Sequence, residues 1–173
     1  METTAVRRAE IRDASRLPAV ERSAAQAFLE HPHLAWVADD SVQTVEQHMK
    51  LIESEVAWVA VDRDDAPIAF LNGNSTNGNL HIREVSVHLD HQRKGIGRAL
   101  MGAAKQWAVE NSCSTITLTT FRNIPWNEGF YKSLGFRTLK SSEVTPSLDT
   151  IMKDEADSGL PIEQRCAMCL RLT

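Results

Sequence analysis

The chain has few cysteines, little excess charge and no long apolar stretch, and each shortage excludes a class of protein. Only three of its 173 residues are cysteines, an odd and sparse count that favours a reducing compartment, so we expect a cytoplasmic protein. No run approaches the roughly 20 apolar residues that cross a bilayer, and the N-terminus has no apolar signal core; we expect neither membrane association nor secretion. The net charge of −4 argues against a general nucleic-acid binder.

Two of the cysteines, Cys166 and Cys169, form a CxxC pair with no second CxxC or HxxxH cluster in the chain. A closed zinc site needs about four ligands. The surrounding stretch 164–172, QRCAMCLRL, alternates like a strand, which directs the two thiols to opposite faces. We therefore interpret both as structural cysteines and expect no metal.

What the sequence has is an alternation of strand-like and helix-like segments along its whole length. Runs rich in β-branched or alternating apolar residues predict strands at 5–11, 55–62, 67–75, 79–88, 114–120, 136–143 and 163–173. Apolar residues at helical spacing predict helices at 13–29, with Asp13 as the N-cap, and at 44–54, 96–111, 125–135 and 146–160. We expect one α/β domain over residues 1–173.

A basic stretch with two glycines joins the fourth predicted strand to a helix. Residues 92–97 read QRKGIG. Backbone N–H groups at a helix N-terminus bind anions, and glycine lets a phosphate come close to the backbone. A Walker loop is absent, and Leu100 occupies the third glycine position of the dinucleotide fingerprint. The stretch predicts a phosphate-binding loop; the alternative is an ordinary strand-to-helix turn with a solvated basic rim.

The QRKGIG stretch resembles the Q/R-x-x-G-x-G/A pyrophosphate motif of the GNAT superfamily of acyl-coenzyme A-dependent N-acetyltransferases. FYKSLGF at 130–136 resembles the second signature of that superfamily, and residues 119–131, TTFRNIPWNEGFY, are similar to a subgroup with the pattern TTFRxxPWNxxFY. The resemblance covers essentially the whole chain. It implies a mixed, mostly antiparallel seven-stranded sheet that is splayed between strands 4 and 5 and flanked by helices, and it implies acetyl-CoA as the cofactor.

The resemblance also assigns cofactor-binding positions. The fourth strand would pair its backbone with the pantetheine arm, and the loop after it would hold the phosphates; these positions are Val85, Ser86, Val87, Gln92, Arg93, Lys94, Gly95, Ile96, Gly97 and Arg98. Many members carry an asparagine about seven residues before the tyrosine, where this chain has Ile124. Asn127 is our candidate substitute, and the alternative is that it only orders the turn after Pro125.

Acetyl transfer to an amine requires a base for the amine and an acid for the leaving thiolate. Glu84 aligns with the glutamate that serves as general base in many members; the alternative is a solvent-facing or ion-paired strand residue. Tyr131, the only tyrosine, aligns with the superfamily acid; the alternative is aromatic packing. The Val85 amide would serve as a one-donor oxyanion site.

The acceptor site is the least defined part of the sequence. His31, His33 and Trp36 lie between the first two predicted helices, where superfamily members build that site. His81 falls where arylalkylamine acetyltransferases carry one of two paired histidines, but the partner position is Arg83, so the histidine pair is incomplete. We expect His81 to line the amine entrance, and the alternative is an exposed strand residue.

The leading interpretation is an N-acetyltransferase acting on a primary amine, with a small molecule such as a polyamine or arylalkylamine favoured. A lysine or N-terminal acetyltransferase and a non-catalytic acyl-CoA sensor are the alternatives. We expect a monomer or homodimer that binds neither nucleic acid nor membrane.

Overall fold

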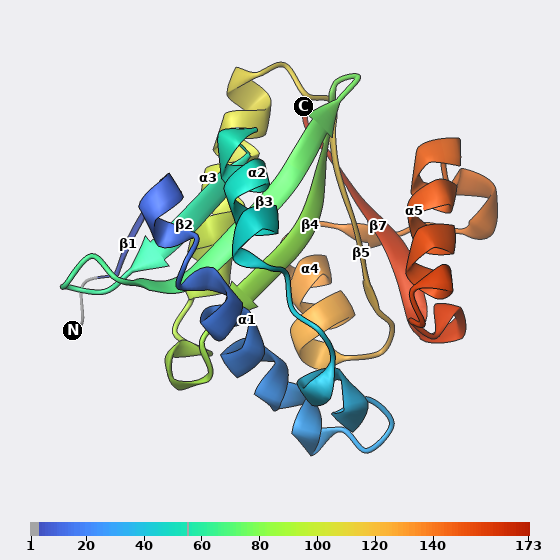
Figure 1. The fold of residues 1–173 in the computed structure, drawn as a ribbon. Helices are drawn as coiled ribbons and strands as arrows, with labels where there is room; N and C mark the ends of the chain where they lie inside the picture. The colour runs from blue at the N-terminus through green and yellow to red at the C-terminus, as the bar shows by residue number, and fades with distance from the viewer. Residues whose placement is uncertain (1–3, 55) are drawn as a thin grey trace. The chain divides into compact units, whose positions relative to one another are not determined.

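The computed structural model describes residues 4–54 and 56–173 and contains a seven-stranded mixed sheet flanked by helices (Figure 1). The strands are β1 Ala5–Arg8, β2 Ala57–Val61, β3 Pro67–Thr76, β4 Asn79–Val87, β5 Thr115–Phe121, β6 Arg137–Thr138 and β7 Arg165–Arg171. Their order in the sheet is β1-β2-β3-β4-β5-β7-β6. The pairs β1/β2, β2/β3, β5/β7 and β6/β7 are antiparallel, and β4/β5 is parallel. The predicted α/β class and mixed sheet are confirmed.

Two of the helices, α2 and α5, begin at a threonine whose hydroxyl caps the first turn. They are α1 Leu17–Ala25, α2 Val45–Glu53, α3 Ile96–Glu110, α4 Phe130–Ser133 and α5 Pro146–Asp157. The Thr44 hydroxyl accepts the Gln47 N–H at 3.2 Å, and the Gln47 side chain accepts the Thr44 N–H at 2.7 Å. Such a reciprocal box satisfies two N–H groups that lack helical partners. The predicted start of the helix at 44–54 is thereby confirmed.

The chain forms two compact units, one made of residues 1–74 and 83–107 and the other of residues 75–82 and 108–173. In the first unit, α1 and α2 lie over one face of β1–β3 and α3 lies over the opposite face (Figure 1). Buried side chains from α1, α2, β2 and β3 make its core on the α1/α2 side, among them Leu17, Ile52, Val59 and Phe70. In the second unit, α5 packs on β7 through Leu148 and Ala167.

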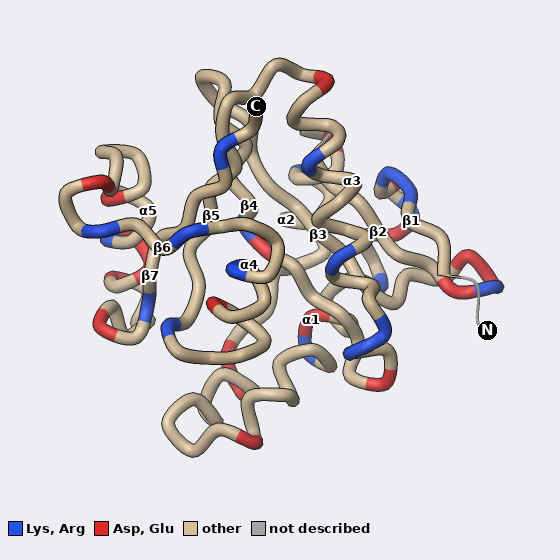
Figure 2. Tube along the Cα trace, turned by 180° about the vertical axis from the view of Figure 1, so that it is seen from behind, with Lys and Arg blue, Asp and Glu red and all other residues tan. Residues whose placement is uncertain are grey.

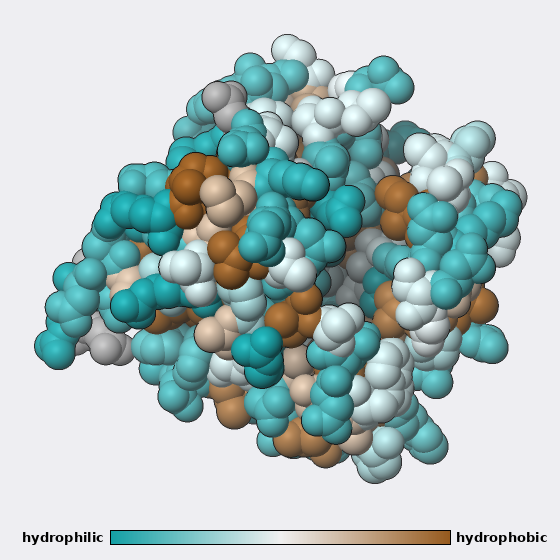
Figure 3. Space-filling model, in the orientation of Figure 1, coloured by the Kyte–Doolittle hydropathy of each residue, from teal (hydrophilic) through white to brown (hydrophobic). Residues whose placement is uncertain are grey.

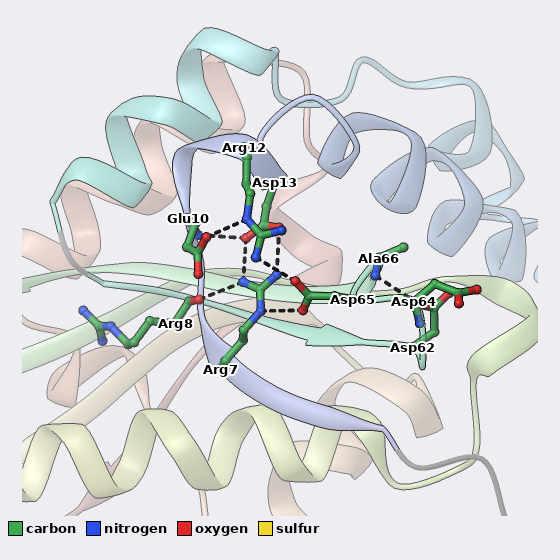
Figure 4. Close-up of polar contacts among 9 residues, drawn as sticks. All are labelled: Arg7, Arg8, Glu10, Arg12, Asp13, Asp62, Asp64, Asp65 and Ala66. Carbon is green, nitrogen blue, oxygen red and sulfur yellow. Dashed lines mark hydrogen bonds and ion pairs between the residues drawn. The ribbon is translucent and has the colours of Figure 1, made fainter.

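The N-terminal segment differs from the prediction because an ion pair captures Asp13. Asp13 is 3% exposed and lies in a 3-10 turn, Ile11–Asp13, instead of capping a helix. The Arg7 guanidinium donates to both of its carboxylate oxygens, at 2.8 and 3.0 Å, and also to Asp65 in the turn between β2 and β3, at 2.9 Å (Figure 4). The helix therefore starts at Leu17, with Arg16 and not Asp13 in the N-cap position, and its expected last turn is a separate 3-10 segment, Gln26–Glu30.

The strand predicted at 136–143 is mostly wrong. Only Arg137 and Thr138 pair with β7, opposite Cys169 and Met168, and Ser141–Glu143 form a 3-10 turn. The strand predicted at 55–62 is confirmed over β2, while its first residue, Glu55, lies outside the described residues.

The surface carries charges of both signs. Figure 2 shows lysine, arginine, aspartate and glutamate interspersed along the chain trace, and the face drawn in Figure 3 is mainly hydrophilic with scattered apolar groups. In the described part of the chain, no helix is long and apolar enough to cross a membrane.

The CxxC cysteines lie on β7 as free thiols. Cys166 is fully buried, and burial raises the pKa of its thiol to about 11; the pKa of half-buried Cys169 is also raised by burial. Raised pKa values keep both as neutral thiols at neutral pH, and thiols are poor nucleophiles and metal ligands.

Candidate active site

The loop between β4 and α3 is shaped by left-handed backbone. Arg93 has φ +61° and Gly95 has φ +81°. Glycine adopts this region without strain, and alternating turn conformations direct backbone N–H groups toward a common concavity. A Cβ built on Gly95 would meet no heavy atom within 4 Å beyond its chain neighbours. The loop therefore leaves open space beside backbone donors, which suits an anionic group.

Charge and anchoring in this loop come from different residues. Arg93, Lys94 and Arg98 are exposed, whereas Ile96 is 5% exposed and fixes the first turn of α3 in the core. Gly97, the second glycine of the motif, is half-buried in that first turn. The 15-residue helix behind the loop adds its positive N-terminal dipole.

Gln92 supports the loop through its side chain. Its amide nitrogen donates to the Val87 carbonyl at 2.9 Å and to the Ala24 carbonyl, at the end of α1, at 3.5 Å. The Leu89 N–H donates to the Ser23 hydroxyl at 3.0 Å. These side chains thus tie the end of β4 and the start of the loop to α1.

Glu84 lies half-buried on β4. The Ser86 hydroxyl, on the same face of the strand two residues later, donates to the Glu84 carboxylate at 2.8 Å. Val85 and Val87 point to the opposite face. The strand therefore presents an oriented carboxylate beside the backbone of Val85.

The segment between α1 and α2 holds the predicted acceptor residues. His31 and His33 approach each other edge to face, with ring centroids 6.1 Å apart. The Nδ1 atom of His31 is buried without a hydrogen-bond partner in the described part of the chain. Trp36 is 39% exposed on the next 3-10 segment, Ala35–Asp39, and Leu34 between them is buried. The structure brings the two histidines together and leaves the tryptophan face accessible.

In the second unit, β5 leads into a π-helical turn, Pro125–Gly129, and then into α4. Tyr131 in α4 is 8% exposed. Its ring packs edge to face against Phe130 and Phe136, at 5.1 and 5.8 Å between centroids. The aromatic contacts predicted as the alternative to catalysis are therefore present, and they fix the ring that carries the hydroxyl.

Asn127 lies in the π-turn with its amide oriented. The Thr120 hydroxyl, at the end of β5, donates to the Asn127 Oδ1 atom at 3.2 Å. The Nδ2 atom is buried and has no hydrogen-bond partner among residues 4–54 and 56–173. A buried amide with an unpaired N–H₂ is costly unless a ligand or water accepts from it. Asn127 therefore fits a contact with a carbonyl of a bound cofactor.

Glu128 is the important residue that the sequence did not reveal. It is 5% exposed, and its carboxylate accepts from the Asn123 N–H at 2.7 Å, the Thr138 hydroxyl at 2.7 Å and the Lys132 ammonium at 3.0 Å. These donors, led by the Asn123 N–H, lower the pKa of Glu128 to about 2. A glutamate in a short polar helix is normally a surface residue, so no sequence signal indicated its burial.

His81, on β4 in the second unit, is oriented by a chain of polar side chains. Its Nδ1 atom lies 3.1 Å from the Thr117 hydroxyl, which also accepts from the Asn79 amide at 2.9 Å. The ring is half-buried and fixed on the face of the sheet that carries Thr117.

The chain belongs to the acetyltransferase (GNAT) family, whose model matches residues 18–136. Members of this family are acyltransferases that use acetyl-CoA. The fold is similar to that of the PaiA N-acetyltransferase from Thermoplasma acidophilum in complex with coenzyme A, at 15% identity and a TM-score of 0.73, covering 98% of this chain and 99% of the other.

Two further solved structures share the fold. The Mycobacterium tuberculosis protein Rv2747, in a complex with CoA, is 18% identical with a TM-score of 0.68, covering 98% and 99% of the two chains. The ribosomal-protein-S18-alanine N-acetyltransferase from Escherichia coli is 15% identical with a TM-score of 0.69, covering 99% and 95%. At identities below 25%, these likenesses show a shared fold.

Proposed function

We propose that this protein is an N-acetyltransferase that transfers the acetyl group of acetyl-CoA to the primary amine of a small molecule, with a polyamine or an arylalkylamine as the favoured acceptor. The observation that carries the proposal is the exposed basic loop with left-handed backbone at Arg93 and Gly95, directly before a long helix. The chain belongs to a family that uses acetyl-CoA, and this supports the pyrophosphate of coenzyme A as the anion that the loop would bind.

The cofactor-binding residues divide into three groups. Backbone N–H groups from Gln92 to Arg98 would hold the phosphates. The backbone of Val85, Ser86 and Val87 would pair with the amides of pantetheine, as an added strand pairs with a sheet edge. The Asn127 amide would donate to a cofactor carbonyl, because its Nδ2 atom is buried without a partner in the described chain. Bound acetyl-CoA supplies an activated thioester as the acetyl donor.

Two side chains would move protons. Glu84 accepts a proton from the acceptor ammonium, directly or through water, and the hydroxyl of Ser86 holds its carboxylate in place. Tyr131 donates its hydroxyl proton to the departing sulfur, and the packing of Phe130 and Phe136 keeps its ring in one position. The Val85 N–H would stabilise the charge that develops on the carbonyl oxygen.

A small cationic acceptor is supported by the net charge of −4 and by the exposed Trp36 beside two histidines. The face of Trp36 suits the apolar body and the charged head of an arylalkylamine. His81 would also contact the acceptor amine. We also propose that the protein is cytoplasmic, acts as a monomer or homodimer and belongs to the subgroup with the TTFRxxPWNxxFY signature.

The test is a panel of acceptors incubated with acetyl-CoA and the purified protein, with free thiol measured over time. The panel contains polyamines, arylalkylamines, lysine-containing peptides and peptides with free N-termini. Turnover of a small amine at least tenfold above every peptide supports the proposal. Turnover of peptides alone favours a protein acetyltransferase, and acetyl-CoA binding without turnover of any amine favours a sensor.

A further inference from the structure

The π-turn that follows β5 is held by the side chains of two neighbouring residues, Asn127 and Glu128. Asn127 is linked to β5 by the Thr120 hydroxyl. Glu128, the next residue, links the Asn123 N–H at the start of the turn to the Thr138 hydroxyl on β6. The turn is therefore attached to the strand before it and to the strand after it.

The turn needs this support because its backbone is irregular. Asn123 has φ +57°, a left-handed conformation that asparagine adopts more readily than most residues other than glycine. The Ile124 carbonyl accepts the N–H groups of both Asn127 and Gly129, at 3.0 and 3.3 Å. Such π-turns are rare and less favourable than regular helix, and they occur frequently at functional sites. The buried Glu128 carboxylate accepts the Asn123 N–H and so holds the entry to this irregular turn.

We infer that Thr120 and Glu128 are positioning residues that fix the amide of Asn127 so that its Nδ2 donor faces the cofactor. The Thr120 hydroxyl donates to the amide oxygen, which leaves the amide nitrogen on the other side of the group. Glu128 fixes the backbone that carries the amide, and its carboxylate has only donors as partners, including the Lys132 ammonium at 3.0 Å. This inference rests on the proposed use of acetyl-CoA.

Glu128 is suited to this role because its charge does not change under working conditions. Its pKa is lowered to about 2, so the carboxylate stays ionised from mildly acidic pH upward. An amide in its place would keep the shape but would present an N–H₂ group to donors, which leaves buried groups unsatisfied. Replacing this carboxylate should therefore loosen the turn without creating a cavity.

The first experiment is a double-mutant cycle on acetyl-CoA affinity, measured by calorimetry. Thr120→Val keeps the side-chain shape and removes the hydroxyl, and we expect affinity to fall roughly 3- to 10-fold, the worth of about one hydrogen bond. Thr120→Ser should restore affinity to within about twofold. In a protein that already carries Asn127→Ala, the Thr120 hydroxyl has no amide to orient. Adding Thr120→Val to that variant should therefore cause no further loss of acetyl-CoA affinity. Additive losses in the double variant would overturn the inference for Thr120.

The second experiment compares Glu128→Gln with Glu155→Gln. Glu155 is a matched control, because its carboxylate also accepts hydrogen bonds from a threonine hydroxyl, that of Thr119, and from a cation, Arg165. Glu155 lies on α5, so these bonds hold α5 and not the turn. We expect Glu128→Gln to speed amide hydrogen exchange in residues 122–131 of the cofactor-free protein and to weaken acetyl-CoA binding by at least about threefold. Glu155→Gln should change neither the hydrogen exchange of residues 122–131 nor the affinity for acetyl-CoA.

The two readouts separate failure of this inference from failure of the proposed function. If the unmodified protein does not bind acetyl-CoA, the proposed function is wrong, and the exchange data still decide whether Glu128 holds the turn. If the unmodified protein binds acetyl-CoA and Glu128→Gln binds it within twofold, Glu128 is not a positioning residue. Unchanged exchange in residues 122–131 would lead to the same conclusion.

Discussion

The loop that leads into α3 and the turn that leads into α4 both follow a strand of the sheet, but they keep their shape in opposite ways. The first is exposed and basic, and its path depends on left-handed backbone at Arg93 and Gly95. The second contains a buried carboxylate, Glu128, and a buried amide atom of Asn127, and its path depends on side-chain hydrogen bonds.

This difference predicts which substitutions each region tolerates. In the loop, backbone conformation matters most, and exposed side chains contribute modest electrostatic terms. In the turn, side-chain chemistry matters most, because every buried polar group needs its partner. The same distinction separates the proposed chemical roles, with anion binding in the loop and oriented side chains in the turn.

The largest effect is expected for Tyr131→Phe, beside the turn. The ring keeps its contacts with Phe130 and Phe136, but the proton donor for the sulfur is lost. Positioned acids contribute roughly 100- to 10,000-fold, so steady-state turnover should fall at least 100-fold. Acetyl-CoA affinity should change little, because one neutral hydrogen bond contributes about 0.5–1.5 kcal/mol. A melting curve provides the control for folding; turnover within about twofold of the unmodified protein would show that Tyr131 is not the acid.

Glu84→Gln should produce the next largest loss, and the loss should depend on pH. Near neutral pH most acceptor amine is protonated, so removing the base should lower turnover about 100-fold. At high pH the free amine is abundant, and the loss should shrink. Ser86→Ala is the matched control, because it keeps the carboxylate and removes only its hydroxyl donor. A rate deficit that is the same at every pH would contradict a base role and favour acceptor binding.

The difference between the loop before α3 and the turn before α4 also explains which parts of the molecule the sequence could predict. The helix boundary at Thr44, which is governed by a local cap, was predicted correctly. The position of the glycine loop between a strand and a helix was also predicted correctly, because its glycines and charges are contiguous. Asp13 was predicted wrongly as a helix cap. Its carboxylate instead pairs with Arg7, which also donates to the distant Asp65, and this three-residue arrangement forms only in the folded chain. Placement of β7 between β5 and β6 is likewise a tertiary property.

The turn was predicted only in part for the same reason. Its helical character and its tyrosine were visible as a contiguous motif. The role of Glu128 was not, because its partner Thr138 comes from a strand that is only two residues long. A local pattern cannot show that a glutamate is buried when one of the groups that hydrogen-bond to it lies on a different element.

Replacement of Gly95 tests whether backbone conformation controls the loop. A β-branched valine is strongly disfavoured at φ +81°, whereas asparagine tolerates positive φ. We expect Gly95→Val to weaken acetyl-CoA binding by at least about tenfold, which corresponds to about 1.4 kcal/mol, and Gly95→Asn to weaken it less. Calorimetry on both folded variants is the measurement. Equal affinities for the two variants would show that the left-handed conformation is unimportant.

Acid unfolding tests the buried carboxylate of the turn. The pKa of Glu128 is lowered from 4.5 to about 2, so its contribution to the free energy of unfolding is complete above about pH 4.5 and is lost as pH falls toward 2. The stability difference between the unmodified protein and Glu128→Gln should therefore shrink between pH 5 and about pH 2 in urea titrations. Glu143→Gln, which removes an exposed carboxylate that also accepts a backbone N–H, should show a much smaller difference. A constant difference across this range would mean that the charge of Glu128 is not what stabilises the turn.

The smallest effect is expected for Lys94→Gln in the exposed loop. An exposed ammonium near a phosphate contributes about 0.2–1 kcal/mol, so acetyl-CoA affinity should fall roughly 1.5- to 5-fold at low salt. Because salt screens exposed charges, the gap should close as ionic strength approaches 1 M, where the screening length is about 3 Å. The melting temperature should not change, in contrast to substitutions in the turn. Lys105→Gln removes the same charge from an exposed position further along α3 and should leave affinity unaltered. If the two lysine variants lose the same affinity, the attraction comes from the overall charge of the protein, and Lys94 has no specific place in the phosphate-binding loop.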